Sequence, residues 1–206
     1  MRKKPRSAPT MRFILSEHFW VLDALSPSEW HLIRILPEMA SGKHFHQRSR
    51  DRLFPSPISD DVIADESTLS QIEDWDELIR PELEEAFSEA RAVVGEDLNR
   101  VRNVPLDEIF DEGAYVDEME DVGDEAESDR AYRVEVPHEH TESWYSTLNQ
   151  ARLLMHEEYG IADAEERYLA KTMGMKGLDE ERMLLIAQYE LYSVLQSILV
   201  ENIMNP

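Results

Sequence analysis

Two pairs of histidines have the spacing at which both imidazoles could reach one metal ion. His138 and His140 form one pair, and His44 and His46 form the other. Residues two apart on a strand point to the same side, so each pair could offer two nitrogen ligands to zinc. Neither pair has the helical His-Glu-x-x-His spacing of a metalloprotease. We therefore favour surface imidazoles in a turn after Pro137, and we predict no metal or other cofactor.

A second candidate is the basic segment Lys43–Arg52, which carries one Lys and three Arg with histidine and phenylalanine between them. Interleaved cations and aromatic rings are typical of contacts with single-stranded nucleic acid. The chain as a whole has a net charge of −23, which repels nucleic acid and anionic lipid. We expect a solvated loop, or one paired with the acidic loop at residues 104–130, and keep nucleic-acid binding as an alternative.

A third candidate is the flank formed by Tyr145, Asn149 and Arg152, which are four and three residues apart and so share one side of a helix. If Arg152 is buried beside the packed stripe of that helix, it needs an acidic partner. Asp60 or Asp61 is the partner we expect. We interpret this group as a structural ion pair, and as a binding site in the alternative.

Residue types and motifs give no support for nucleophilic catalysis. The chain has no cysteine, which excludes thiol catalysis and cysteine-ligated zinc. It also has no Gly-x-Ser-x-Gly or Ser-x-x-Lys motif and no glycine-rich phosphate loop. We predict no catalytic residues.

The elements that must position these residues are mostly helices. Phe13–Leu15 and Phe19–Leu22 predict a small hairpin, and Ser26 with Glu29 forms a capping box that starts the next helix. A strand is expected at residues 132–136, and Trp144 heads the inner stripe of the helix after it. Apolar periodicity and caps predict helices over residues 26–40, 79–102, 141–159, 163–173 and 179–204.

The last of these helices is apolar over an arc of about 240°, far wider than a surface helix needs. We therefore predict a mainly α fold, a helical bundle packed around this helix with a small β element near the N-terminus. Because the other helices are expected to cover the rest of this helix, residues 200–204 are the part left to contact a partner. That partner is another protein or a second copy of the chain.

The bulk composition indicates one folded domain. We expect a basic flexible tail at residues 1–11 and a single helical domain at 12–204, with an acidic loop inserted at 104–130. No apolar run reaches about 18 residues without a charge, so we predict no membrane span and a cytoplasmic location.

Three segments of the chain carry recognisable motifs. In order, they are Arg52–Pro55 (including Phe54) with Asp60–Asp61, Trp144–Leu153 followed by Tyr159–Ile161, and Tyr192–Leu199. Together they resemble a bacterial family, the domain-of-unknown-function family numbered two thousand and seventeen. Its members open with a short β segment and a helix, pass through an Arg-Leu-Phe-Pro motif, and finish with a Trp-x-x-x-Leu-Asn-x-x-Arg-Leu helix and an apolar helix.

The resemblance implies no activity and no catalytic residue, because the family has none assigned. Its genes are often found beside that of the ClpS adaptor, which delivers substrates to the Clp protease. We expect a non-enzymatic interaction or regulatory protein with a protein partner, linked to Clp-dependent proteolysis. The alternatives are a nucleic-acid-associated regulator that uses Lys43–Arg52 and an enzyme with a His-ligated metal.

Overall fold

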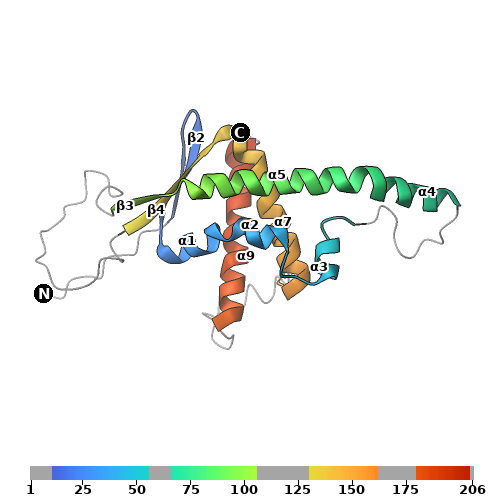
Figure 1. Cartoon of the computed structure of the whole chain (residues 1–206). Coiled ribbons are helices and arrows are strands. Elements are labelled where there is room, and N and C mark those ends of the chain that lie inside the picture. Colours follow the sequence, from blue (N-terminus) through green and yellow to red (C-terminus); the bar gives the residue numbers. More distant parts are fainter. Residues whose placement is uncertain (1–10, 56–65, 106–129, 162–179, 205–206) are drawn as a thin grey trace, which may run out of the picture. The chain divides into compact units, whose positions relative to one another are not determined.

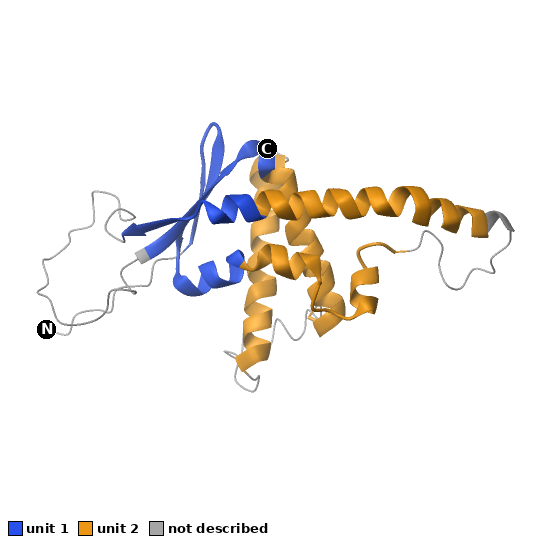
Figure 2. Cartoon of the chain, viewed as in Figure 1, with its two compact units in different colours: residues 1–34, 95–140 blue, residues 35–94, 141–206 orange. Residues whose placement is uncertain are grey.

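The computed structural model describes residues 11–55, 66–105, 130–161 and 180–204. The chain divides into two compact units, each built from segments far apart in the sequence (Figure 2). Unit 1 comprises residues 1–34 and 95–140, and unit 2 comprises residues 35–94 and 141–206. This division does not test the prediction of a single domain over residues 12–204, which stays a prediction.

Unit 1 contains a four-stranded antiparallel sheet in the order β1-β2-β4-β3. The predicted hairpin is confirmed as β1 and β2, although its turn lacks glycine and asparagine. Ser16 replaces them, because its hydroxyl donates to the Phe19 carbonyl at 2.9 Å and accepts from the Phe19 N–H at 3.2 Å. The strands are β1 (Arg12–Leu15), β2 (Phe19–Leu25), β3 (Arg102–Pro105) and β4 (Arg130–Pro137) (Figure 1).

Helix α1 (Pro27–Arg34) lies against β2 and β4 and closes the core of unit 1. The predicted capping box is present, with the Ser26 N–H donating to Glu29 at 2.8 Å and the Glu29 N–H donating to the Ser26 hydroxyl at 3.2 Å. The Trp30 ring stacks on Tyr132 at 5.3 Å between centroids. The buried apolar residues of this core include Trp20, Leu22, Leu25, Leu32, Ile33, Val134 and Val136.

The sheet of unit 1 holds one fully buried carboxylate, that of Asp23. Arg12 donates to it at 2.6 Å and Arg133 at 2.8 Å. Burial alone would raise the pKa of Asp23, but the hydrogen bonds from Arg133 and Arg12 outweigh it and hold this pKa below its ordinary value of 3.8. The charge of Asp23 thus ties β1 and β4 to the strand between them.

Unit 2 is helical, with α7 as the helix that contacts most of the others. Helices α2, α3 and α9 all pack against α7, and Arg91 of α5 donates to Gln150 of α7 at 2.5 Å. The elements are α2 (Leu36–Ser41), α3 (Gln47–Asp51), α4 (Glu66–Asp74), the π-turn η1 (Trp75–Ile79), α5 (Arg80–Asn99, whose last five residues belong to unit 1), α7 (Thr141–Tyr159), α9 (Glu180–Leu199) and the π-turn η3 (Val200–Met204).

Helix α9 buries one face, not the whole predicted apolar arc. Tyr192, Leu195 and Leu199 are buried, whereas Leu184 is 52 % exposed and Val194 46 % exposed. The mainly helical class and the small sheet are confirmed, and a bundle that surrounds α9 stays a prediction. By length and composition alone, the stretch from Glu180 to Met204 could cross a membrane, a test that the core helix of a soluble protein also passes.

Several predicted bounds change. The helix expected at 79–102 begins at Glu66 and ends at Asn99, because residues 102–105 pair with β4 as strand β3. At the two ends of the acidic loop expected at 104–130, residues 104–105 lie in β3 and residue 130 lies in β4. Residues 106–129, the helix expected at 163–173 and residues 1–10 of the tail lie outside the described residues.

Candidate functional site

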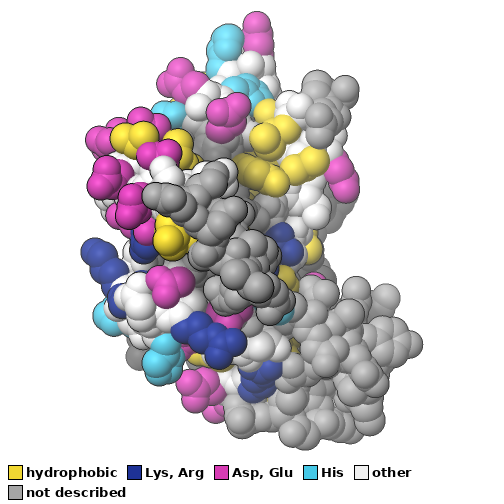
Figure 3. Space-filling view, turned by 90° about the vertical axis from the view of Figure 1, so that its right-hand side faces the viewer, with side chains coloured by type: hydrophobic (Ala, Val, Ile, Leu, Met, Phe, Trp, Pro, Cys, Tyr) yellow, Lys and Arg dark blue, Asp and Glu magenta, His cyan; other side chains and the backbone are white. Residues whose placement is uncertain are grey.

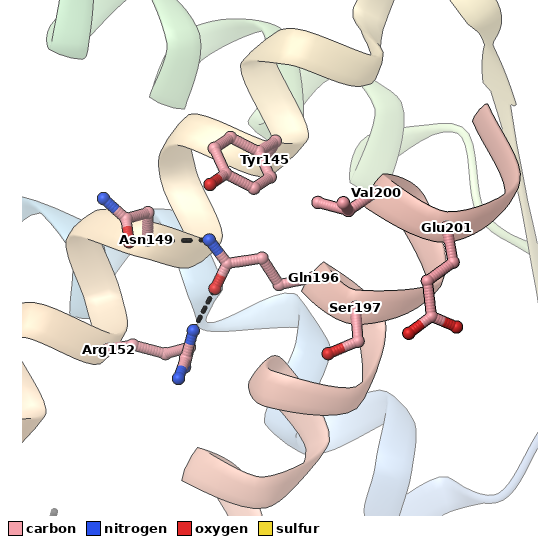
Figure 4. Close-up of a pocket in the computed structure, with 7 residues that line it drawn as sticks. All are labelled: Tyr145, Asn149, Arg152, Gln196, Ser197, Val200 and Glu201. Carbon is pink, nitrogen blue, oxygen red and sulfur yellow. Dashed lines mark hydrogen bonds between the residues drawn. The ribbon is translucent and has the colours of Figure 1, made fainter. Parts of the chain in front are cut away.

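A polar pocket lies between α7 and the C-terminal helix of unit 2 (Figure 4). Its volume is about 360 Å³. We call it the α7–α9 pocket, and it is lined by Tyr145, Asn149 and Arg152 of α7, by Gln196 and Ser197 of α9, and by Val200 and Glu201 of η3.

Helical spacing explains why these residues meet. Tyr145, Asn149 and Arg152 occupy successive turns on one side of α7, as the sequence predicts. Gln196 and Val200 are four residues apart on the facing helix. Apolar neighbours on both helices, including Leu148 and Leu195, are buried and hold the two backbones together. The polar flanks are therefore fixed at the edge of that contact.

Gln196 connects the two sides of the pocket. Its carboxamide oxygen accepts a short hydrogen bond from Arg152, and its carboxamide nitrogen donates to Asn149 at 3.4 Å. The Arg152 guanidinium also lies over the ring of Tyr189, 5.2 Å from the centroid, and donates to the Tyr189 hydroxyl at 3.5 Å. One arginine is thus held by neutral groups from α9.

The charge of Arg152 has no carboxylate partner among the residues that the structure describes. Its Nε atom is buried and makes no hydrogen bond, and the same holds for Nδ1 of His156, one turn further along α7. A buried polar group that lacks a partner costs about 1–3 kcal/mol. Within the described segments, the guanidinium therefore sits at the pocket wall without a carboxylate partner and with one buried donor unused.

The pocket brings together several polar groups that can bind a ligand. The pocket offers one cation, two carboxamides, a phenol, a hydroxyl and the exposed carboxylate of Glu201. Within the described residues, no basic side chain accepts a hydrogen bond from the Ser197 hydroxyl. A guanidinium beside carboxamides is suited to hold a carboxylate.

Comparison with known families gives a match over nearly the whole chain. Residues 15–203 match the family described as a domain of unknown function (DUF2017). The chain belongs to this family. No match was found among the curated proteins or among the solved structures.

The DUF2017 match contains all seven pocket residues and all three segments on which the resemblance rests. Sequence reasoning found the α7 side of the pocket and left residues 200–204 for a partner, but it did not assign Gln196 or Ser197. A signal for the α9 side is the polar pair Ser197 and Glu201, because two polar residues four apart on an apolar helix mark a face that stays accessible.

The four histidines considered as metal ligands each have a different partner. In unit 1, His138 lies 2.9 Å from the Ser16 carbonyl, and His140 lies 3.0 Å from the buried carboxylate of Asp97. In unit 2, His44 contacts Glu38 at 3.0 Å and His46 contacts Glu158 at 2.6 Å. No group of three His, Asp or Glu side chains placed for a metal occurs in the described segments.

The basic segment Lys43–Arg52 contains helix α3 and faces acidic residues of α7. Arg48 lies 3.4 Å from Glu157. Glu158 accepts hydrogen bonds from the Ser49 hydroxyl at 2.6 Å and from the His46 backbone at 3.0 Å. These bonds, that of Ser49 above all, lower the pKa of Glu158 below its ordinary value of 4.5. Part of the positive charge of this segment is therefore balanced within unit 2.

The remaining motif residues have packing positions where they are described. Trp144 is fully buried in α7. Phe54 packs against Phe87 at 5.5 Å between ring centroids and against the guanidinium of Arg80 at 5.7 Å. Arg52 and Pro55 are exposed beside it. Asp60 and Asp61, the acids expected to pair with Arg152, lie outside the described residues.

Proposed function

We propose that this DUF2017 protein is a non-enzymatic interaction or regulatory protein, and that its α7–α9 pocket recognises a carboxylate group of the partner. The observation that supports this is Arg152, a guanidinium at the pocket wall whose described neighbours are Gln196 and Tyr189. An entering carboxylate would compensate this charge and accept hydrogen bonds in the geometry that arginine prefers.

The pocket suits one negative charge better than two. Arg152 is its single cation, and Glu201 lies on its edge. A phosphate dianion would gain the same guanidinium but would also be repelled by the Glu201 carboxylate. A ligand that carries an apolar or an amide group next to its carboxylate could place the apolar group against Val200 or the amide against Asn149. An acidic side chain of a peptide, or the C-terminus of a chain, has these groups.

The partner is proposed to belong to Clp-dependent proteolysis in the bacterial cytoplasm. Support for this step comes from the family resemblance, whose genes often lie beside that of the ClpS adaptor. A carboxylate-binding pocket would give such a protein a means to recognise an acidic group on an adaptor or a substrate.

The first prediction tests the pocket chemistry with two small molecules of the same shape. Propionate should raise the melting temperature of the purified protein, whereas propionamide should not. At ten times its dissociation constant, a ligand adds about 1.4 kcal/mol to the stability of the folded state. The shift should disappear in Arg152→Gln and persist in Arg48→Gln, whose arginine is exposed outside the pocket.

Two results of this experiment would contradict the proposal. If propionate raised the melting temperatures of Arg152→Gln and of the unchanged protein equally, propionate would be binding outside the α7–α9 pocket. A shift that appears only after Asp60→Asn and Asp61→Asn are introduced together would show that the chain's own acids occupy Arg152, as the structural ion-pair interpretation holds.

A pull-down from cell lysate then addresses the partner. The unchanged protein and Arg48→Gln should recover the same protein, and Arg152→Gln should lose it. Recovery of a Clp component would support the proteolysis link. A partner that all three proteins recover equally would separate the pocket from the interaction.

A further inference from the structure

The long helix of unit 2 extends well beyond the helices it packs against. Figure 2 shows α4, η1 and the first part of α5 continuing away from α2, α7 and α9 of the same unit. Three large apolar residues on this extension are exposed, at 52 % for Leu69, 61 % for Leu78 and 42 % for Ile79. Single exposed apolar residues are common, but a run of them along one helix marks an interaction surface.

The π-turn aligns these residues with the rest of the apolar stripe. Trp75, Ile79, Leu83 and Phe87 recur every four residues, a spacing that drifts around an α-helix of 3.6 residues per turn. The wider π-turn over Trp75–Ile79 reduces this drift, and it ends just before Pro81, which has no N–H to donate. One stripe thus continues from Phe87 outward to Ile79 and Trp75.

Described residues cover the inner end of the stripe, whereas Leu69, Leu78 and Ile79 at the outer end are exposed. Phe87 packs on Phe54, and Arg80 lies over the same ring. Beyond this contact and past Leu83, the apolar residues continue to Leu69, with Trp75 and Ile72 half-buried and Ile79 exposed. We call Leu69, Ile72, Trp75, Leu78 and Ile79 the outer stripe.

The surroundings of the outer stripe are strongly acidic. Figure 3 views unit 2 from the side on which α4 lies and shows hydrophobic side chains among acidic ones in its upper left part. The one base between residues 69 and 89, Arg80, already contacts Asp51 at 4.0 Å and Glu84 at 3.1 Å. The eight acids of this stretch, each exposed, are Glu73, Asp74, Asp76, Glu77, Glu82, Glu84, Glu85 and Glu89.

We propose that the outer stripe binds an amphipathic helix of a partner protein whose flanks carry Lys and Arg. Charge selects this occupant, because a second copy would bring the same eight carboxylates against these, and like charges facing each other are destabilising. A basic helix would bury Leu78 and Ile79 on its apolar face and pair its flanking cations with the acids beside the stripe. This inference is independent of the α7–α9 pocket, from which it uses no residue.

The second prediction concerns a synthetic peptide that serves as the probe. An 18-residue peptide with leucines at helical spacing and lysines on its flanks should bind the full chain, measured by fluorescence anisotropy of a label on the peptide. Leu78→Asn with Ile79→Asn should weaken binding about tenfold or more, because two apolar side chains lose their burial while the charge is unchanged. The matched control, Ala86→Asn with Ser88→Asn, alters two exposed residues of the same helix and should bind as the unchanged protein does.

The remaining peptides and variants separate the other occupants. A peptide with glutamates in place of lysines should not bind. If the lysine peptide bound equally well to Leu78→Asn with Ile79→Asn and to Ala86→Asn with Ser88→Asn, only charge would attract it, and the proposal would be overturned. Sedimentation that reveals a dimer lost in Leu78→Asn with Ile79→Asn would identify a second copy as the occupant. Binding that appears only after residues 1–10 are deleted would assign the site to the chain's own basic tail, and either result would overturn the proposal.

Discussion

Arginine shows most clearly how surroundings set the role of a single residue. Arg12 and Arg133 both lie within hydrogen-bond distance of the Asp23 carboxylate, so the three charges form one ion-pair network in the sheet of unit 1. Arg152 is also partly buried, but its described partners are a carboxamide and a phenol. The first group has a structural role, whereas the second has no carboxylate among the described residues and is the basis of the proposed carboxylate site.

The third prediction follows from the Asp23 group. Asp23→Asn should lower the free energy of unfolding by about 1–3 kcal/mol, less than for a fully enclosed pair, because both arginines reach solvent. Arg34→Gln, which changes an exposed arginine of α1, serves as the control. Chemical denaturation followed by circular dichroism measures the stability of both variants. An Asp23→Asn midpoint equal to that of the unchanged protein would show that the buried charge group contributes nothing to stability.

The same group gives a pH dependence with a defined sign. The pKa of Asp23 is lowered in the folded state, so its contribution is fully present above the unfolded pKa of about 3.8 and is lost as the pH falls through the lower folded value. The stability difference between the unchanged protein and Asp23→Asn should therefore shrink below about pH 4. A difference that stays constant down to pH 2 would assign the loss to packing.

At the scale of elements, the position of a residue on α9 determines whether its substitution should destabilise unit 2. Its buried face packs on α7, and its opposite residues, such as Val194, are exposed. The continuation η3 carries Val200 and Glu201 at the edge of the α7–α9 pocket. One helix thus contributes to the core along most of its length and to the candidate site near its end.

The fourth prediction compares two substitutions on this element. Leu195→Asp should unfold the protein, at a cost of about 4 kcal/mol or more, since Leu195 is 3 % exposed and a carboxylate there has no partner. Val200→Asp should melt within a few degrees of the unchanged protein, because Val200 is partly exposed at the pocket. It should nevertheless weaken propionate binding, because it adds a negative charge beside the proposed carboxylate.

Thermal melting by circular dichroism measures both variants. A folded Leu195→Asp protein with an unchanged melting temperature would mean that α9 is not a core element. Unaltered propionate binding in Val200→Asp would argue against a carboxylate in this pocket.

For the whole molecule, charge limits which partners are compatible. The net charge is −23, and the basic segment Lys43–Arg52 lies against Glu157 and Glu158 of α7. Arg48 is thereby paired with Glu157, and the net negative charge of the whole chain opposes the binding of nucleic acid. A helix that carries lysine and arginine is, by contrast, attracted to the acidic stretch beside the outer stripe.

The fifth prediction is that neither RNA nor DNA binds in a gel-shift assay, even at low salt, where nucleic-acid affinity is greatest. The triple variant Arg48→Gln, Arg50→Gln and Arg52→Gln should behave in the same way. A salt-dependent shift that the triple variant abolishes would restore the nucleic-acid alternative and would direct attention to α3.

The sequence by itself determined the features that depend on neighbours along the chain. The capping box at Ser26, the helix predicted over residues 141–159 and the shared flank of Tyr145, Asn149 and Arg152 all follow from residues a few positions apart. Family membership also follows from the sequence, because it rests on the order and spacing of motifs. Such local signals survive because short hydrogen bonds and helical periodicity do not depend on the rest of the fold.

Only the tertiary structure decided which of these residues meet across the chain. It paired β3 with β4, buried one face of α9 and left Leu184 exposed, and placed Gln196 against Arg152. The physical reason is that burial depends on which surfaces pack together, and a helix that is apolar almost all round does not specify the face it will use. The pocket exists because that choice of face sets the polar flanks of α7 and α9 opposite each other.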